Sequence, residues 1–461
     1  MTEREHYDVL IIGGGQAGIP LAHALAEAGR RVALVEESHL GGSCVNFGCT
    51  PTKAVIASAR VAHLARRADE FGLKIPRVAA DFPAVLRRAE RILLESRDGL
   101  RKGLTETENP KLLRGHARFA GRDGKHFSVL IGERKMTAAQ VVIDTGTRSL
   151  IPPIEGLEDV DFICAENWLE RRKLPARLAI IGGGYIGLEM GQFYRRMGSH
   201  VVVVEESAQV AGHEDEDVAR ALQQLLEAEG IEFRLRAKVA RVKARKGGVA
   251  LTLEDGGAGP AEIRASHLFV ATGRQPNTDD LGLETIGVKV SERGIIEADR
   301  RLATNIEGVW AAGDVRGGPM FTHTSWDDYR VLLSQIAGDG SRTTERVVPY
   351  AIFTDPQLGR VGLTESEARE KGRRIKVARF EMKKNGKARE SGETEGFIKV
   401  IVDAGNDQLL GAAVLAMEGA ELVHLYVDLM NAGAPYTVIR DAVHIHPTLA
   451  EAAQSVFEQL D

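Results

Sequence analysis

The feature that most constrains the fold is a segment that occurs twice. One copy, VLIIGGGQAGIPLAHALAEAGRRVALVEES, starts at Val9, and the other, LAIIGGGYIGLEMGQFYRRMGSHVVVVEES, starts at Leu178. Each copy predicts an apolar strand, a glycine loop, a helix and a β-branched strand that ends in a glutamate. The matching positions are Gly13 with Gly182, Gly15 with Gly184, Gly18 with Gly187, and Glu36 with Glu205.

A glycine loop between a strand and a helix predicts a dinucleotide site. The glycines let the backbone approach a pyrophosphate, whose charge meets the N-terminus of the helix. The glutamate about 20 residues further on accepts hydrogen bonds from ribose hydroxyls. Two such units indicate two dinucleotides, and FAD with a nicotinamide nucleotide is the natural pair because one passes a hydride to the other. The neighbouring Glu205 and Glu206 would repel a 2′-phosphate, which favours NAD(H) over NADP(H).

Three further apolar runs end in glycine, as parallel strands do where they meet a ligand. They read VVIDTGT from Val141, HLFVATGR from His267 and GVWAAGD from Gly308. Asp314, at the end of the third run, is a candidate acceptor for a ribityl hydroxyl, with a turn or helix-cap role as the alternative. From about residue 345 alternating strands are followed by helices, which predicts a separate C-terminal α+β domain.

Composition narrows the class of protein. The 461 residues suggest about three domains, and three cysteines are too few for a secreted disulfide framework. The sequence shows neither a signal-peptide pattern nor an apolar run of about 18 residues, so we expect a cytoplasmic protein with no membrane partner. The net charge of −5 includes no basic excess, so no nucleic-acid partner is expected.

Two of the cysteines, Cys44 and Cys49, lie close together in GGSCVNFGCTPTK. Pro51 is typical of the first turn of a helix, so Cys49 would stand at a helix N-terminus, where the dipole stabilises a thiolate. Lys53 would lie on the same helix face as Cys49. A structural disulfide, part of a zinc site and two independent buried thiols are the alternatives. In a cytosolic chain, a redox role is favoured.

The segment GGSCVNFGCTPTK resembles the redox-active motif of the group I pyridine nucleotide–disulfide oxidoreductases. The likeness runs from Asp8 to Glu451 and includes both glycine units, the GD pair at residues 313–314 and HPTLAE near the end. It implies an α/β fold with two Rossmann-like dinucleotide-binding domains, for FAD and NAD, plus a C-terminal α+β dimerisation domain. The implied domains are an FAD-binding part at residues 1–149, an NAD-binding domain at 150–276, a return to the FAD-binding domain at 277–343 and a dimerisation domain at 344–461.

The resemblance also implies roles for individual residues. Cys49 would be the flavin-facing thiol that forms a charge-transfer complex, and Cys44 the outer thiol that exchanges with substrate. Lys53 would pair with Glu189 near the flavin, and Tyr185 would cover the empty nicotinamide pocket. The residues expected at FAD are Gly13, Gly15, Gly18, Glu36, Gly42, Ser43, Lys53, Ala117, Thr145, Gly146, Gly313, Asp314, Met320, Phe321 and Thr322. Those expected at NAD are Gly182, Gly184, Tyr185, Gly187, Glu189, Glu205 and Gly273.

The segment HIHPTLAE carries His446 and Glu451 around a helix that is predicted to start at Pro447. An imidazole oriented by a carboxylate can move protons near neutral pH; a packed or capping histidine is the alternative. The resemblance implies that His446 is the acid/base and that Glu451 orients it. It further implies a homodimer in which both residues serve the cysteines of the other subunit.

The motif ending GCTPTK and the segment SWDDYR look closest to the mercuric reductase-like branch. The implied function is transfer of electrons from NADH through FAD to a redox-active disulfide, and then to a disulfide or soft-metal acceptor. No resident metal is expected, although Cys44 and Cys49 could bind a soft metal as substrate. The chain departs from mercuric reductase in that it ends SVFEQLD without a cysteine pair. Dihydrolipoamide dehydrogenase is the main alternative, and a flavin-bearing metal-binding or redox sensor protein with little turnover is another.

Overall fold

The first repeated unit forms the centre of a seven-stranded sheet, with the order β3-β2-β1-β6-β5-β4 and β16 beside β6. The computed structural model describes residues 5–254 and 261–460. Strands β3, β2, β1, β6 and β16 are parallel, and β4 and β5 continue the sheet as antiparallel hairpins. The elements are β1 (His6–Ile12), α1 (Gly18–Glu27), β2 (Val32–Glu36), α2 (Gly42–Asn46), α3 (Cys49–Arg66), α4 (Phe82–Thr105), β3 (Lys111–Arg114), β4 (Ala117–Asp123), β5 (His126–Ile131), β6 (Arg134–Ile143), β7 (Thr147–Ser149), β16 (Val309–Ala311) and α7 (Thr322–Ala337).

The second repeated unit forms a smaller parallel sheet, in the order β10-β9-β8-β14, with the antiparallel sheet β11-β12-β13 beside it. Its strand–helix–strand core, β8-α5-β9, repeats β1-α1-β2, because the same alternation of apolar strand, glycine loop and helix occurs in both segments. The elements are β8 (Arg177–Ile181), α5 (Tyr185–Met197), β9 (His200–Val204), α6 (Glu216–Ala228), β10 (Ile231–Arg234), β11 (Lys238–Arg245), β12 (Gly248–Glu254), β13 (Glu262–Ala265), β14 (His267–Val270) and β15 (Arg274–Pro276), which pairs with β7.

The C-terminal part forms a five-stranded antiparallel sheet in the order β17-β18-β21-β20-β19. Strands β20 and β21 are almost wholly buried, as their largely apolar sequences predict, and β20 also buries Lys399. The elements are β17 (Tyr350–Ile352), β18 (Gln357–Gly362), α8 (Glu365–Glu370), β19 (Ile375–Glu381), α9 (Gly386–Glu390), β20 (Phe397–Asp403), β21 (Leu409–Ala416), α10 (Gly419–Leu422), α11 (His424–Asn431), α12 (Thr437–Arg440) and α13 (Ala450–Ser455). In the part of the chain that the structure describes, the 3₁₀ segments are Ala68–Phe71, Trp168–Glu170, Leu283–Thr285, Gly313–Arg316, Met382–Lys384 and Phe457–Leu460.

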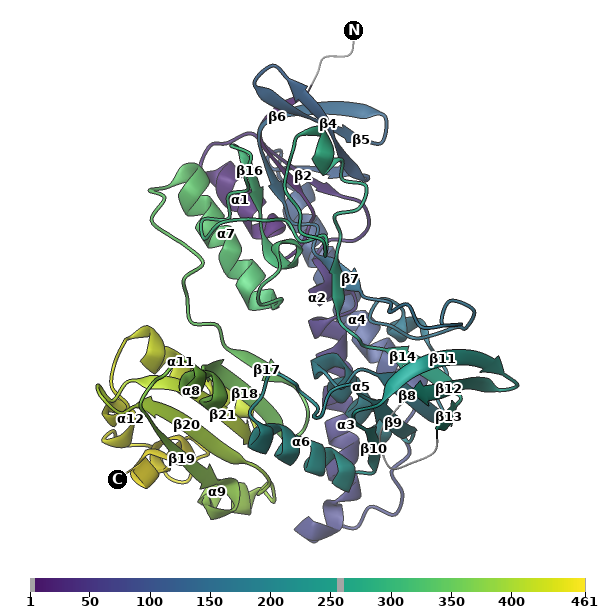
Figure 1. Cartoon of the computed structure of the whole chain (residues 1–461), viewed down its shortest axis with the longest axis vertical. Helices are drawn as coiled ribbons and strands as arrows, with labels where there is room; N and C mark the ends of the chain where they lie inside the picture. Colours follow the sequence, from purple (N-terminus) through teal and green to yellow (C-terminus); the bar gives the residue numbers. More distant parts are fainter. Residues whose placement is uncertain (1–4, 255–260, 461) are drawn as a thin grey trace.

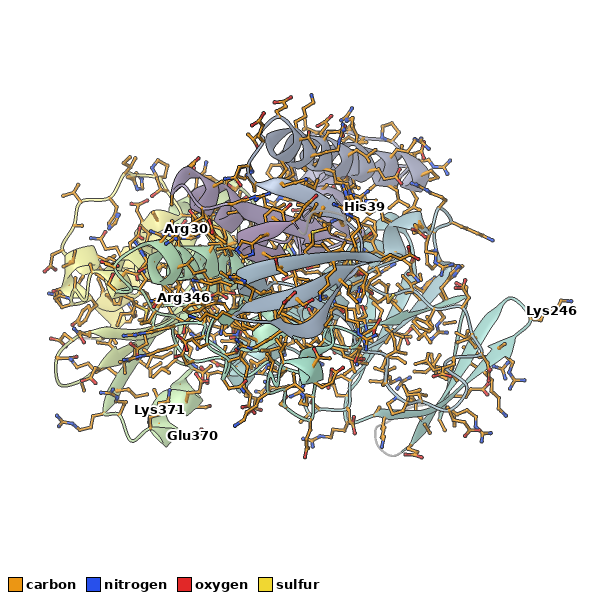
Figure 2. The ribbon with its side chains drawn as sticks, turned by 90° about the horizontal axis from the view of Figure 1, so that it is seen from above. Arg30, His39, Lys246, Arg346, Glu370 and Lys371 are labelled. Atoms are coloured by element: carbon orange, nitrogen blue, oxygen red, sulfur yellow. The ribbon has the colours of Figure 1, made fainter. Side chains whose placement is uncertain are left out.

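The long helices α3 and α4 connect the three parts (Figure 1). They extend from the first sheet toward the second unit, where α3 packs against α5, while α1 and α7 pack together on the first sheet. The C-terminal sheet lies beside the second unit, and the β11–β12 hairpin projects outward with Lys246 at its tip (Figures 1 and 2). As a result, α2 and the start of α3 lie between the two nucleotide units.

Buried ion pairs join the second unit to the C-terminal sheet. Arg196 of α5, with 4% of its side chain exposed, binds Asp355 at 2.6 Å and Glu229 at 2.7 Å. Lys399 of β20, with 5% exposed, binds Asp215 at 3.3 Å as well as neighbouring carboxylates. Buried charges of this kind are tolerated because every cation has a carboxylate partner, and the pairs fix how the two parts sit against each other.

The predicted α/β class, with two Rossmann-like units and a C-terminal α+β domain, is confirmed. One local prediction is wrong, because the last helix begins at Ala450 and not at Pro447. The backbone N–H of Thr448 is instead bound by the Glu451 carboxylate at 2.8 Å, so residues 447–449 form a turn ahead of the helix. Within the described residues, no helix combines the length and the apolar character that crossing a membrane requires.

Candidate active site

Each glycine loop packs against the chain that leaves the neighbouring parallel strand, β6 in the first unit and β14 in the second. Gly13 has a φ of +110°, and a Cβ there would lie 2.1 Å from the carbonyl oxygen of Asp144. Gly182 has a φ of +109°, and its Cβ would lie 2.4 Å from the carbonyl oxygen of Ala271. A side chain is excluded at both positions by backbone conformation and by space. Each loop leads directly into the N-terminus of a helix, and the backbone N–H groups there can bind a phosphate.

The two predicted ribose acids have the same geometry. Glu36 accepts hydrogen bonds from the backbone N–H groups of Gly14 and Ser38, both at 2.8 Å. Glu205 accepts the matching bonds from Gly183 and Ser207, both at 2.7 Å. Each carboxylate is thus held at the end of its second strand, beside its glycine loop, where a dinucleotide needs an acceptor for its ribose.

One cavity of about 2040 Å³ extends from the first glycine loop past the cysteines to the second loop. Most of the predicted site residues line it: Gly13, Gly15, Glu36, Gly42, Ser43, Cys44, Cys49, Lys53, Ala117, Thr145, Gly146, Asp314, Met320, Phe321, Thr322, Gly184, Tyr185, Glu189, Glu205 and Gly273. Four predicted glycines are not part of the lining: Gly182 in the second loop, Gly18 at the start of α1, Gly187 within α5 and Gly313 at the start of a 3₁₀ segment. His446 and Glu451 are not part of it either.

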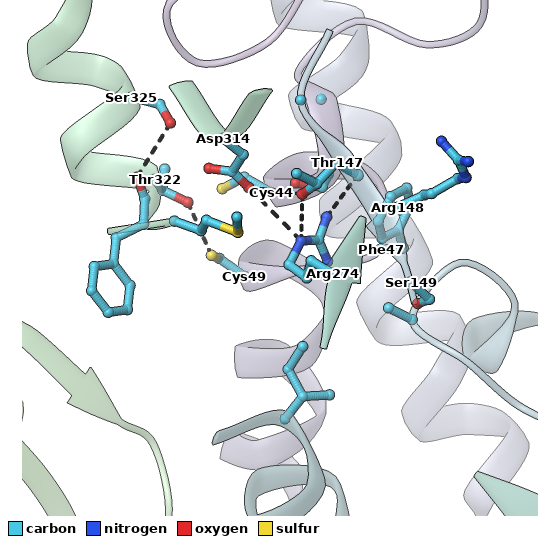
Figure 3. A pocket seen from close by; sticks show the side chains of 18 of the residues that line it. Cys44, Phe47, Cys49, Thr147, Arg148, Ser149, Arg274, Asp314, Thr322 and Ser325 are labelled. Atoms are coloured by element: carbon cyan, nitrogen blue, oxygen red, sulfur yellow. Dashed lines mark hydrogen bonds and ion pairs between the residues drawn. The ribbon is translucent and has the colours of Figure 1, made fainter. Parts of the chain in front are cut away.

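Cys44 lies on α2, and Cys49 is the first residue of α3; both thiols are free. The Cys49 sulfur lies 3.2 Å from the hydroxyl of Thr322, which is the first residue of α7 (Figure 3). A hydrogen bond from Cys44 and the nearby Lys53 ammonium lower the pKa of Cys49 to about 6. The same contact and burial raise the pKa of Cys44. The pair is therefore asymmetric, with a thiolate at Cys49 and a protonated thiol at Cys44 near neutral pH.

Lys53 and Glu189 form an ion pair across the contact between α3 and α5. The Lys53 Nζ lies 2.7 Å from the Glu189 Oε2, and the other carboxylate oxygen accepts the backbone N–H of Phe353 at 2.9 Å. The ammonium also lies 4.5 Å from the centre of the Phe353 ring, within cation–π range. With 7% of its side chain exposed, Glu189 depends on this cation for compensation.

Asp314 is part of a chain of polar contacts that the sequence did not predict. The Thr147 hydroxyl donates to the Asp314 carboxylate at 3.1 Å, and the Arg274 guanidinium donates to that hydroxyl at 2.6 Å. Figure 3 shows the three side chains together beside the cysteines. Burial raises the pKa of Asp314, and Arg274, whose Nε lies 3.8 Å from the carboxylate, opposes this shift.

Three aromatic rings from separate segments gather at the second unit's end of the cavity. Tyr185 stacks on Phe321 with 6.1 Å between ring centroids and on Tyr350 with 5.7 Å, and the last two are 5.4 Å apart. The Tyr350 hydroxyl donates at 2.5 Å to Glu214, a buried carboxylate that also pairs with Arg360 at 3.3 Å. We call Tyr185, Phe321 and Tyr350 the aromatic cluster.

His446 and Glu451 are joined to each other but not to the cysteines of their own chain. The Nδ1 of His446 lies 2.9 Å from the Oε1 of Glu451, and 78% of the histidine side chain is exposed. The hydrogen bond from Thr448 and the contact with His446 lower the pKa of Glu451. The dyad is oriented by its own loop and presents its second ring nitrogen outward.

Sequence reasoning missed the residues that reach the site through tertiary packing. Arg274, Thr147, Tyr350 and Phe353 line the cavity but were given no role. The runs VVIDTGT and HLFVATGR did include Thr147 and Arg274, so their places directly after a strand-end glycine were a usable signal. Tyr350 gave none, because it comes from the C-terminal sheet and meets Tyr185 only in the folded chain.

A family model described as pyridine nucleotide-disulphide oxidoreductase matches residues 7–328, and one described as the dimerisation domain of the same group matches residues 348–456. The chain belongs to the pyridine nucleotide-disulphide oxidoreductase family. It is therefore an NAD(P)H-dependent flavoprotein disulfide oxidoreductase with a dimerisation domain, which confirms the family resemblance of the sequence.

Several relatives match over nearly their whole length. The probable pyridine nucleotide-disulfide oxidoreductase RclA of Escherichia coli is 34% identical over 456 residues, which cover 98% of both chains. A dihydrolipoyl dehydrogenase of Cupriavidus necator is 33% identical and covers 99% of this chain and 98% of its own. A mercuric reductase of Streptomyces lividans is 34% identical and covers 97% and 94%. Among solved structures, the Cu(II) complex of the HOCl-induced flavoprotein disulfide reductase RclA from Escherichia coli has a TM-score of 0.89 at 33% identity and covers 99% of this chain and 100% of its own.

Proposed function

We propose that this protein transfers electrons from NADH to the Cys44–Cys49 pair and from there to a disulfide or a soft metal ion bound at Cys44. The observation that carries the proposal is the asymmetric pair of free thiols in a cavity that both glycine loops share. The Cys49 sulfur is suited to remain a thiolate, and the Cys44 sulfur is suited to exchange with an acceptor.

The first unit fits FAD, and the second fits NADH. Gly13 and Gly182 leave space where a Cβ would meet backbone, and Glu36 and Glu205 stand ready for ribose hydroxyls. We assign residues 1–149 and 277–343 to the FAD-binding domain, because β16 joins the first sheet, and residues 150–276 to the NAD-binding domain. Residues 344–461 form the dimerisation domain.

When bound, FAD supplies the two-electron chemistry that links the hydride of NADH to the disulfide. One hydride equivalent breaks the sulfur–sulfur bond and leaves Cys49 as a thiolate and Cys44 as a thiol, which balances two electrons and one proton. The low pKa of Cys49, about 6, keeps it ionised at neutral pH. Lys53, held by Glu189 at 2.7 Å, places a positive charge near the Cys49 thiolate and lines the cavity in which FAD would be held.

The acceptor reacts at Cys44. A base takes the Cys44 proton, and the Cys44 sulfur attacks a disulfide to form a mixed disulfide and release one thiolate, which takes that proton back. The Cys49 thiolate then attacks Cys44, which re-forms the Cys44–Cys49 bond and releases the second thiolate. This thiolate takes a proton from solvent, so two thiols leave with two electrons. Equivalent acceptors are one Hg(II) or two Cu(II), which thiolates bind well. No cluster of three or more His, Cys, Asp and Glu side chains suited to a metal ion occurs within residues 5–254 and 261–460, so a soft metal would be substrate at the cysteines.

The proton donor would be His446 of a second subunit. The histidine is exposed, bound to Glu451 at 2.9 Å and located in the dimerisation domain, so a homodimer can bring it to the partner's cysteines. Glu451 fixes the ring so that the free nitrogen points outward, which suits general acid–base catalysis.

The test is anaerobic NADH oxidation with a panel of acceptors: a lipoamide-type disulfide, Hg(II), Cu(II) and a quinone. Cys44→Ser should retain bound FAD and lose reduction of disulfide and metal acceptors, whereas Cys164→Ser, a matched change at a buried thiol, should keep both. Full turnover of Cys44→Ser with these acceptors would remove the cysteine pair from the reaction. Bound FAD without turnover on any acceptor would instead favour a binding or sensor protein.

A second candidate is the NAD-linked oxidation of dihydrolipoyl groups. The oriented dyad of His446 and Glu451 favours it, because thiol oxidation needs a base. Comparing the initial rates with dihydrolipoamide plus NAD and with NADH plus each acceptor distinguishes the two directions. A rate with dihydrolipoamide that exceeds every reductive rate would establish the second candidate.

A further inference from the structure

Asp144 is a buried carboxyl directly beneath the first glycine loop. It follows β6, and its backbone N–H donates to the carbonyl of Ile12 at 2.7 Å. Its side chain is turned into the loop, where Oδ2 accepts the backbone N–H of Gly18 at 2.7 Å. A Cβ on Gly15 would lie 2.9 Å from the same oxygen. The carboxyl group therefore packs against the glycine loop and accepts a hydrogen bond from the backbone N–H at the start of α1.

The second unit provides an internal comparison. Ala271 occupies the position of Asp144, because its backbone N–H donates to the carbonyl of Ile181 at 2.8 Å and its carbonyl lies against Gly182 in the same way. A Cβ on Gly184, the counterpart of Gly15, would meet nothing within 4 Å. The fold of a nucleotide unit thus does not require this carboxyl. A carboxyl group at this position is present in the first unit and absent from the second.

The charges around Asp144 are unfavourable to a carboxylate. The residue is 6% exposed, and the nearby carboxylates are Glu36 on β2, Asp314 after β16 and Asp328 on α7. The nearby cations are paired with other carboxylates. Arg316 and Arg346 bind Asp328 at 3.0 and 2.6 Å, and Arg274 lies 3.8 Å from Asp314. Within residues 5–254 and 261–460, no cation forms an ion pair with Asp144. Burial is the main cause that raises the pKa of this group, and the carboxylates add to it.

We propose that Asp144 works as a neutral carboxylic acid beneath the phosphate loop, so that the affinity of the first unit for FAD depends on one proton. This inference rests on the proposed FAD site. In its neutral form, the side chain accepts the Gly18 N–H with one oxygen and keeps an O–H on the other, which can donate to a phosphate oxygen or a bridging water. Asp144 is thus a cofactor-positioning residue.

The sign of the pH dependence follows from charge. An ionised Asp144 would add a negative charge next to the negatively charged diphosphate at a site with little water, so ionisation and FAD binding oppose each other. By linkage, the affinity for FAD is constant at low pH and falls as the pH rises above the pKa of Asp144, by up to about tenfold per pH unit. The second unit, with Ala271, carries no such group.

The experiment measures FAD dissociation from the holoenzyme at pH 6 to 9, from the recovery of free flavin fluorescence on dilution. The wild-type dissociation constant should rise with pH within this range, by up to about tenfold per pH unit above the pKa of Asp144. A wild-type constant that stays the same from pH 6 to 9 would overturn the inference. Asp144→Asn, an uncharged side chain of the same shape, should stay within about threefold. Asp144→Ala, which copies the second unit, should also lose the slope while binding FAD more weakly at every pH, because the Gly18 N–H loses its partner.

The outcomes separate the two proposals. A wild-type slope in Asp144→Asn would assign the pH dependence to another group and overturn this inference. Loss of FAD from both variants at every pH would also overturn it, because it would mean that the charged carboxylate is required. A wild-type protein that binds no FAD at any pH would instead refute the FAD site itself, whatever the state of Asp144.

Discussion

The hydroxyl of Thr322 should help to hold Cys49 as a thiolate, and Thr322→Val removes only that hydroxyl. A hydrogen bond to a charged group contributes about 1.5–3 kcal/mol. Sulfur is a weak acceptor, so we take about 1.5 kcal/mol, which corresponds to about one pKa unit. Because the pKa of Cys49 is about 6, the variant should titrate near pH 7. The thiolate fraction at pH 6 then falls from about one half to about one tenth.

The assay is the rate of iodoacetamide alkylation of the reduced protein between pH 5 and 9, with the modified cysteine identified by peptide mass spectrometry. Alkylation of Cys49 should be about fivefold slower at pH 6 in Thr322→Val and nearly unchanged at pH 9, where both proteins are ionised. Ser325→Ala is the matched control, because this hydroxyl donates to the carbonyl of Phe321 and not to the sulfur. An alkylation midpoint that does not move in Thr322→Val would refute the assignment.

Three further predictions test other parts of the site. Arg196→Met leaves Asp355 buried without one of its cations and should lower the free energy of unfolding by about 3 kcal/mol, measured by urea denaturation. The control Arg220→Met, at an exposed pair, should lower it by under about 1 kcal/mol. Equal losses would mean that the buried pair stabilises the fold no more than an exposed one. Glu205→Ser removes one repulsive charge and should raise the ratio of kcat/KM for NADPH to that for NADH by about tenfold; an unchanged ratio would place specificity elsewhere. His446→Ala should slow disulfide turnover by about 10²–10⁴-fold with FAD retained, and a near-normal kcat would exclude the acid–base role.

Local patterns predicted what local sequence determines. The glycine loops, the acids Glu36 and Glu205 and the helix that starts at Cys49 are each encoded within a few residues, so their geometry could be predicted. The family resemblance added the ion pair of Lys53 with Glu189, which joins two helices that are far apart in the sequence but in contact in the fold.

Contacts between distant segments could not be predicted in this way. Tyr350 and Phe353 come from the C-terminal sheet and reach the cavity only because buried ion pairs fix that sheet against the second unit. Asp144 was visible only as the residue two positions before the strand-end glycine Gly146. Its direction toward Gly18 is a property of the parallel register between β1 and β6, which a single strand pattern does not contain.

If Tyr185 covers the nicotinamide pocket, as the resemblance implies, the aromatic cluster sets an energetic threshold for entry of the second nucleotide. If Tyr185 must swing aside to admit a nicotinamide, it has to leave two stacked neighbours, each contact being worth about 0.5–1.5 kcal/mol. The stacked arrangement would then weaken nucleotide binding by roughly 5- to 150-fold relative to a site in which Tyr185 is already displaced. Because the hydroxyl of Tyr350 is hydrogen-bonded to Glu214, the Tyr350 ring stays in place when Tyr185 moves. Tyr185 can then stack on it again when the nucleotide dissociates.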